Sequence, residues 1–126
     1  MARGSLAPHP DGAERSGELL YARIVDEVRD GGLSNAEMAQ VIGVAERQIR
    51  NWSGGTNAPS GRNRDRLLEL HYLVGLLREV YTHEGAEIWL HGRKKSLNGR
   101  RPIDLLENDE SELVLDAIER LRAGAM

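Results

Sequence analysis

Cysteine and phenylalanine are absent from the 126 residues of this chain, and proline occurs only four times. Without cysteine the chain forms no disulfide and offers no thiolate ligand to a metal, which suits a reducing compartment. No stretch approaches the roughly 18 consecutive apolar residues that a membrane span requires. The N-terminus also lacks the apolar run of a signal peptide. We therefore expect a cytoplasmic protein whose interior is built mainly from leucine, isoleucine and valine.

Motifs that carry catalysis are also missing. The four histidines, His9, His71, His83 and His91, do not have the spacing of metal ligands. No glycine-rich loop of the phosphate-binding types is present, and the serines lie at expected helix caps and turns. The sequence therefore indicates neither an enzyme nor a metal or cofactor site.

Strand signals and internal repeats are lacking too, and the apolar residues recur at helical spacing. This spacing predicts an all-α fold with helices over 18–30, 60–81 and 82–91, and a last helix ending at Gly124. Residues 1–17, rich in glycine, proline and charge, read as a flexible tail. The 60–81 helix is expected to be the longest and to join the two halves, and its apolar excess suits a dimer. Gly75 in its middle suggests close approach of another helix.

The most informative segment runs from Ser34 to Trp52 and predicts a helix-turn-helix within residues 18–59. Ser34 and Glu37 have the spacing of a capping box, and Gly43 can end the first helix and permit the sharp turn. Apolar side chains at helical spacing then face inward, namely Met38, Ala39, Ile42, Ile49 and Trp52. A short helix pair with a polar, basic second helix is a common way to read the DNA major groove.

Candidate DNA contacts follow from this layout. On the second helix, the polar side chains left outside are Arg47, Gln48, Arg50 and Asn51. At the start of the next helix, Arg62 and Arg64 are candidates for phosphate contact. Two alternatives stay open: the segment is an ordinary pair of core helices, or it serves packing and dimerisation without touching DNA.

Charge is distributed unevenly around a net value of −3. Residues 91–101 contain five lysines and arginines and no acid, whereas residues 104–119 are strongly acidic. Two partners on two surfaces is one interpretation, and two solvated faces is the other.

The C-terminal third resembles the toxin-binding domain of Xre/MbcA/ParS-type antitoxins. In that family a tryptophan–leucine pair precedes a G-R-x-P-x-D-L-L segment, an acidic turn and an amphipathic helix. The matching residues here are Trp89, Leu90, Gly99, Pro102, Asp104, Leu105 and Leu106. The loop before Leu97 departs from the family, because Arg93-Lys94-Lys95 replaces an Asn-Pro turn.

The motif residues also have plain structural roles. Gly99 permits a positive-φ turn, Pro102 opens a helix, and Asp104 lies in its first turn. Trp89, Leu105 and Leu106 are expected in the core and not at a contact. Asp109, with Glu112 three residues later, is expected to cap the last helix.

The resemblance implies an antitoxin that covers a RES-type toxin, an enzyme that consumes NAD, and that represses its own operon by binding DNA. On this reading residues 82–126 form the toxin-binding domain. Its candidate contacts are the exposed basic residues Arg93, Lys94, Arg100, Arg101, Arg120 and Arg122. Pairing of these residues with neighbouring acids is the alternative, and a stand-alone transcriptional regulator is the rival function.

Overall fold

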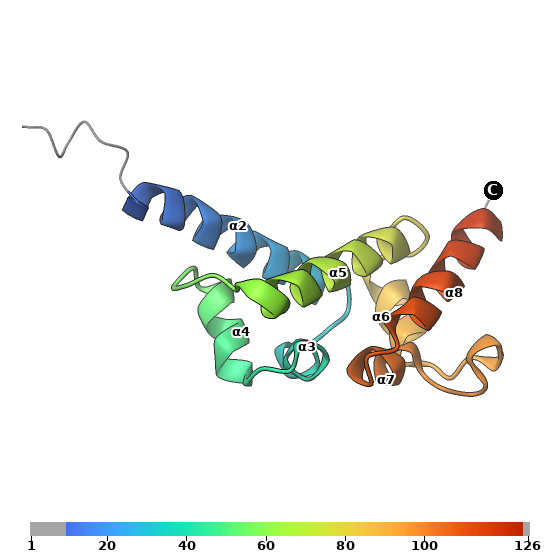
Figure 1. Ribbon diagram of the computed structural model, residues 1–126. Helices are drawn as coiled ribbons and strands as arrows, with labels where there is room; N and C mark the ends of the chain where they lie inside the picture. The colour runs from blue at the N-terminus through green and yellow to red at the C-terminus, as the bar shows by residue number, and fades with distance from the viewer. Residues whose placement is uncertain (1–9, 125–126) are drawn as a thin grey trace, which may run out of the picture.

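Residues 10–124, the part of the chain that the computed structural model describes, form seven α-helices and one 3-10 helix without a β-strand (Figure 1). The described residues contain one isolated β-bridge, between Lys94 and Arg100. The prediction of an all-α fold is confirmed. Below, residues 10–60 are called the N-terminal half and residues 82–124 the C-terminal half.

The first helix, α2 (Pro10–Asp30), begins well before the predicted start at residue 18. This corrects the boundary of the predicted tail, since residues 10–17 are helical and residues 1–9 lie outside the described range. Proline is tolerated at the first helical position because the N–H there has no intrahelical partner. Gly12 and Gly17 each make a helix roughly 1 kcal/mol less stable than alanine would. The sequence therefore indicates a flexible tail here and not a helix.

The predicted helix-turn-helix corresponds to α3 (Asn35–Ile42) and α4 (Glu46–Ser53). The capping box is present: Ser34 Oγ accepts from Glu37 N at 3.1 Å, and Ser34 N donates to Glu37 Oε1 at 2.9 Å. Gly43 ends α3 in the left-handed region at φ 89°. Ile49 and Trp52 are buried, so these local predictions are confirmed.

The connecting helix, α5 (Gly61–Arg78), lies between the two halves and has 18 residues against 21 in α2, so it is not the longest helix. Its apolar excess is used in the protein's own core, and only Leu68 and Tyr72 remain as exposed large apolar side chains on it. The predicted close approach at Gly75 is wrong, because a Cβ there would meet nothing within 4 Å. Close approach occurs instead at Gly31, where a Cβ would lie 1.8 Å from Val74 Cγ1.

The C-terminal half contains α6 (His83–His91), the 3-10 helix η1 (Lys95–Leu97), α7 (Pro102–Glu107) and α8 (Ser111–Gly124). Pro102 opens α7 as predicted. The predicted cap at Asp109 is wrong. This residue has a left-handed φ of 64° and forms an ion pair with Arg66 at 2.7 Å. Glu110 precedes α8 instead, and its carbonyl accepts from Leu113 N at 3.2 Å.

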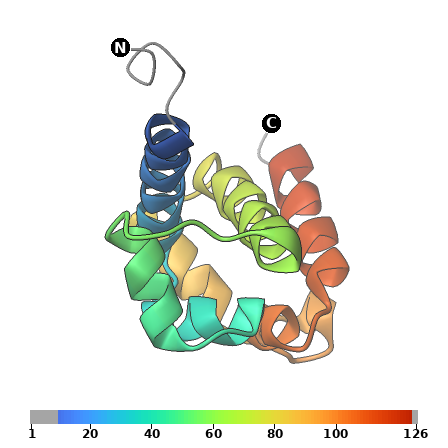
Figure 2. The ribbon, with the colours of Figure 1, turned by 60° about the vertical axis from the view of Figure 1, so that its left-hand side comes forward.

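One hydrophobic cluster extends through both halves. Helix α3 packs against α7, and the two lie side by side along the lower edge of Figure 2. Arg66 ties this joint, because its guanidinium donates to Val41 O at 2.9 Å as well as to Asp109. Gly32 brings α6 close to the turn after α2, since a Cβ on it would lie 2.9 Å from Glu87 Cα. The two halves are therefore parts of one packed unit.

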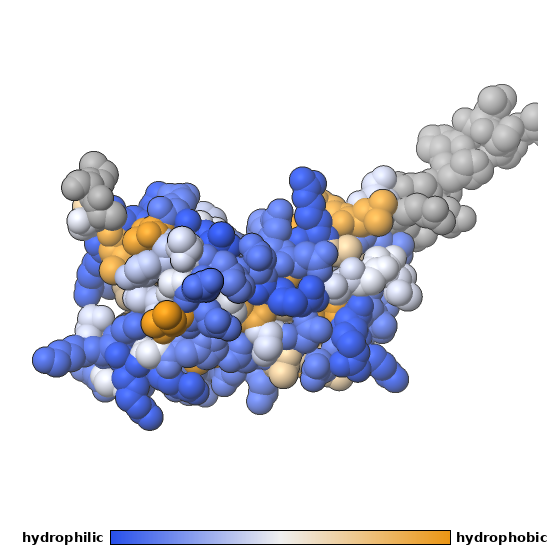
Figure 3. Space-filling model, turned by 180° about the vertical axis from the view of Figure 1, so that it is seen from behind, coloured by the Kyte–Doolittle hydropathy of each residue, from blue (hydrophilic) through white to orange (hydrophobic). Residues whose placement is uncertain are grey.

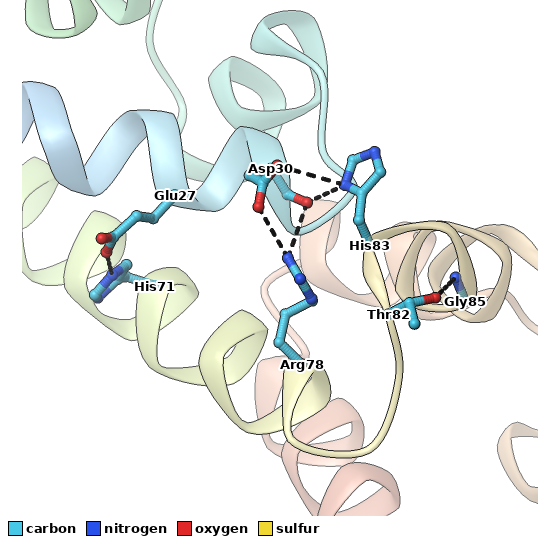
Figure 4. Close-up of polar contacts among 7 residues, drawn as sticks. All are labelled: Glu27, Asp30, His71, Arg78, Thr82, His83 and Gly85. Atoms are coloured by element: carbon cyan, nitrogen blue, oxygen red, sulfur yellow. Dashed lines mark hydrogen bonds and ion pairs between the residues drawn. The ribbon is translucent and has the colours of Figure 1, made fainter.

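Polar contacts hold α2 against α5 and against the start of α6 (Figure 4). Glu27 Oε1 lies 2.7 Å from His71 Nε2 on α5, and Asp30 Oδ2 lies 3.0 Å from Arg78 Nη1. The Asp30 carbonyl also meets His83 Nδ1 at the start of α6. The end of α2 is thus joined to both α5 and α6.

Candidate functional site

The basic segment between α6 and α7 is an ordered turn. Lys94 N donates to Arg100 O at 3.1 Å, and Gly99 N donates to Lys94 O at 2.8 Å. The chain reverses through two left-handed residues, Asn98 at φ 58° and Gly99 at φ 78°. The predicted positive φ at Gly99 is confirmed, and the turn fixes the side chains on either side of it.

Arg101 and Asp104 form a two-bonded fork at the start of α7. Arg101 Nε and Nη2 donate to the Asp104 carboxylate at 2.8 and 2.7 Å. The hydrogen bonds from Arg101 lower the pKa of Asp104, and those same bonds raise the pKa of Arg101. Asp104 lies in the first turn as predicted, where the helix dipole also favours an acid.

Three further basic residues of the loop, Arg93, Lys94 and Arg100, also have partners. Arg93 donates to Gly99 O at 3.0 Å, and Arg100 pairs with Glu110 at 3.3 Å. Lys94 Nζ lies 5.3 Å from the centre of the Trp89 ring, within range of a cation–π contact. Burial lowers the pKa of Lys94. Of the loop cations, Arg100 and Arg101 pair with neighbouring acids, as the alternative expects, whereas Arg93 and Lys94 have other partners.

The two arginines predicted on α8 differ in their connections. Arg120 pairs with Asp116 one turn earlier at 2.7 Å, and its side chain is 68% exposed. Arg122 reaches across to Glu79 after α5 at 2.9 Å and is 37% exposed. Exposed ion pairs of this kind contribute about 0–1 kcal/mol, so Arg120 can exchange its partner at little cost.

The apolar motif residues form core, as the sequence predicts. Leu105 is fully buried, and Leu90 and Leu106 are 2% and 3% exposed. Trp89 is 8% exposed and lies at the edge of the cluster beneath Lys94. The family motif therefore builds the C-terminal half, and the contact surface must lie around it.

On the N-terminal half, the candidate DNA contacts lie on the outer side of α4 and at the start of α5. Arg47, Arg50, Arg62 and Arg64 are exposed, and Gln48 and Asn51 are half-buried. Arg50 pairs with Glu46 at 3.3 Å, and Arg64 lies 3.7 Å from Asp65. Both pairs are exposed and local, so these cations remain accessible to phosphates.

A polar cleft of about 650 Å³ beside α3 and α6 was not predicted from the sequence. Its charged lining side chains are Arg29, Glu37, Glu46, Glu87 and His91. Glu46 is also the first residue of α4, so three carboxylates lie close to the proposed DNA-reading helix. Their charge opposes a phosphate at this edge.

His91 joins the two halves within this cleft. Its Nδ1 lies 2.7 Å from Glu87 O and its Nε2 lies 2.7 Å from Glu37 Oε2. Burial of the ring opposes its charge, but these two acceptors outweigh it and raise the pKa of His91. For Glu37, burial acts in the opposite direction to the bonds with Ser34 and His91, and the bonds lower its pKa. The capping box identified Glu37, whereas no local signal marks its distant partner.

Within residues 10–124, no group of three or more histidine, aspartate or glutamate side chains is placed to hold a metal ion. No helix of this range is long and apolar enough to cross a bilayer.

Comparison with known proteins gives consistent matches. Residues 76–124 match the family described as the antitoxin Xre/MbcA/ParS C-terminal toxin-binding domain. The chain is 38% identical over 104 residues to a probable mycobacterial cidal antitoxin of Mycobacterium tuberculosis, covering 82% of this chain and 89% of that protein. It is 30% identical over 106 residues to the mycobacterial cidal antitoxin MbcA of Mycobacterium bovis, covering 84% and 94%.

The fold is similar to a chain in the crystal structure of the M. tuberculosis MbcT–MbcA toxin–antitoxin complex. The TM-score is 0.70 at 28% identity, covering 83% of this chain and 96% of that chain. The similarity therefore includes both halves and not the matched C-terminal residues alone.

Proposed function

This chain belongs to the Xre/MbcA/ParS family of antitoxins, and we propose that it neutralises a RES-type, NAD-consuming toxin by covering the toxin's active site with its C-terminal half. It is the antitoxin of a toxin–antitoxin system, and its relatives are named as antitoxins and not as enzymes. The observation that carries the proposal is the likeness, over most of both chains, to a chain of a toxin–antitoxin complex. The family assignment favours this function over a stand-alone transcriptional regulator.

The inhibition is steric, with no chemistry of the antitoxin's own. The candidate toxin contacts are Arg93, Lys94, Arg100, Arg101, Arg120 and Arg122. A guanidinium can pair with acidic groups in a nucleotide-binding pocket, and an exposed arginine reaches such a pocket most easily. Because the loop arginines also hold the turn, Arg120 is the candidate with the least structural role.

Co-expression with the protein encoded beside this gene tests the proposal. We expect the two proteins to purify together and bacterial growth to be restored. Deletion of the C-terminal half is a poor variant, because α7 packs on α3 and its loss exposes the shared core. Growth arrest that persists at equal antitoxin levels, with no complex recovered, would overturn the proposal.

We also propose that the α3–α4 pair binds operator DNA in the operon's own promoter. The exposed arginines of α4 and the start of α5 support this, and the carboxylates of the neighbouring cleft limit the affinity. In gel-shift titrations, Arg47→Ala and Arg50→Ala should each weaken binding and reduce the salt dependence by about one counterion. The control Arg120→Ala lies in the other half and should bind normally. Unchanged binding by both α4 variants would reject the assignment.

We further propose that the protein forms a homodimer and that it acts in the cytoplasm. Since most of the leucines of α5 are buried, the large apolar side chains left exposed on α2 and α5 for self-association are Leu19, Leu20, Leu68 and Tyr72. Sedimentation of Leu20→Glu should show a larger monomer fraction than wild type. A monomeric wild-type protein at tens of micromolar would reject the dimer.

A further inference from the structure

An apolar groove opens in the C-terminal half between α6, η1 and α8. Its volume is about 180 Å³, and its lining residues are Trp89, Ser96, Ala117, Arg120 and Leu121. We call it the α6–α8 groove. Seen from behind, apolar surface gathers next to both chain ends, one of which is the end of α8 (Figure 3). All lining residues fall within the match to the toxin-binding family.

On α6, an exposed isoleucine comes directly before Trp89, which lines the groove. Ile88 on α6 is 72% exposed, the most exposed of the large apolar side chains in the described residues. A Cβ added at Gly92, one turn after Ile88, would lie 3.2 Å from Lys94 Nζ. Lys94 Nζ therefore lies close to the chain at the end of α6 as well as over the Trp89 ring.

The rim of the groove is cationic although the surrounding sequence is acidic. Arg120 lines the groove, and Lys94 lies over the ring of Trp89, which is another lining residue. The one carboxylate bonded to Arg120 is Asp116, in an exposed pair that costs little to break. An exposed apolar anchor, a groove for a side chain and a cationic rim are the elements of an interface hot spot. A partner that fits them carries an apolar side chain with a carboxylate beside it.

We propose that the α6–α8 groove is the docking site for an apolar side chain of the cognate toxin, flanked by a toxin carboxylate that faces Arg120 and Lys94. This inference rests on the proposed function and adds the anchor point on the antitoxin. The basic turn then acts mainly as the scaffold of the groove, because its Ser96 lines the groove and its Lys94 lies over Trp89.

Three variants with matched controls test the site, with the co-expressed neighbouring toxin as the probe. Ile88→Glu removes the exposed anchor, and Leu113→Glu makes the same change at an exposed leucine that does not line the groove. Ser96→Trp fills the groove from an exposed position, and Thr56→Trp adds the same bulk to an exposed loop of the other half. Arg120→Glu reverses a rim charge, and Arg23→Glu does so in a comparable exposed i,i+4 pair.

Calorimetry with the purified full-length chain should show at least tenfold weaker toxin binding for each groove variant and changes below threefold for each control. Thermal unfolding should shift little, because all the substituted side chains are exposed. If the wild-type chain binds the toxin and all three groove variants bind it with an affinity within threefold of wild type, the groove is not the docking site. The proposed function would then still stand. Absence of wild-type binding would overturn both. Toxin-free self-association that Ile88→Glu abolishes, with toxin binding unchanged, would assign the groove to a second copy of this chain instead.

Discussion

The two basic regions of this molecule use their arginines differently. On α4, the arginines are exposed and pair at most with a carboxylate of the same helix. In the turn before α7, Arg93, Arg100 and Arg101 bond to a carbonyl, a distant glutamate and a helix-opening aspartate. The two regions look alike in composition, but one is a surface available to a partner and the other is largely part of the fold.

Both basic regions pack on one shared hydrophobic core, so loss of a core side chain in one half should destabilise the other. Trp52→Ala removes a fully buried side chain from α4 and should lower the free energy of unfolding by about 3–5 kcal/mol. The chain has two tryptophans, so Trp89 is then the only tryptophan, and its emission reports on the other half. In urea titrations its transition should move to lower denaturant together with helix loss. A Trp89 transition at the wild-type midpoint would show that the halves unfold independently.

Alanine variants of Gly31 and Gly75 test where another helix packs closely against α5. Gly31→Ala should destabilise the protein by about 1–3 kcal/mol, because its Cβ would overlap Val74. Gly75→Ala should stabilise it by about 0.5–1 kcal/mol. Alanine loses less backbone conformational entropy than glycine when the helix forms, and its Cβ would meet no neighbouring atom within 4 Å. Thermal melts of both variants measure the difference. Equal shifts of the same sign would mean that Gly31 is not the close contact.

The joint between the halves should respond to pH through His91. Both ring nitrogens face acceptors, so only the imidazolium satisfies both, and its pKa is raised above the ordinary 6.5. The contribution of His91 is thus complete below pH 6.5 and lost as pH rises through the folded-state pKa. Denaturation between pH 6 and 8 should show wild type losing stability relative to His91→Gln. The low pKa of Glu37 adds a separate loss under acidic conditions, as pH falls through that value. Parallel profiles for wild type and variant would contradict this assignment.

Alanine variants of one arginine from each basic region should differ slightly in their free energy of unfolding. Arg100→Ala should cost about 0.2–1 kcal/mol, since it loses the pair with Glu110. Arg47→Ala, on an exposed face, should change stability by less than about 0.5 kcal/mol in either direction. Chemical denaturation of the two variants in parallel measures the contrast. A larger cost at Arg47 than at Arg100 would reverse it.

Local signals predicted much of this fold. The capping box, the left-handed glycines after α3 and in the basic turn, and the proline at the start of α7 each depend on neighbours a few residues away. The apolar spacing likewise identified the buried side of α4. Such features are readable because their physics is local.

Features that depend on distant partners could not be read in this way. The close approach was assigned to Gly75 when it occurs at Gly31, because the sequence does not show which helix crosses where. Asp109 was read as a helix cap, but Arg66, more than 40 positions away, holds it. Nothing in the sequence connects His91 to its partner Glu37, because Glu37 belongs to the other half. The proposed contact residues stay predictions for the same reason.

The close fit at Gly32 limits how such antitoxins can be recombined. There the backbone of α6 fills the space that any side chain would need, and repacking of neighbouring side chains does not relieve an overlap with backbone. A chimera that takes its N-terminal half from one relative and its C-terminal half from another must therefore inherit the 31–34 turn and α6 from the same parent. Crossovers placed between them should yield insoluble chains even when each module is native.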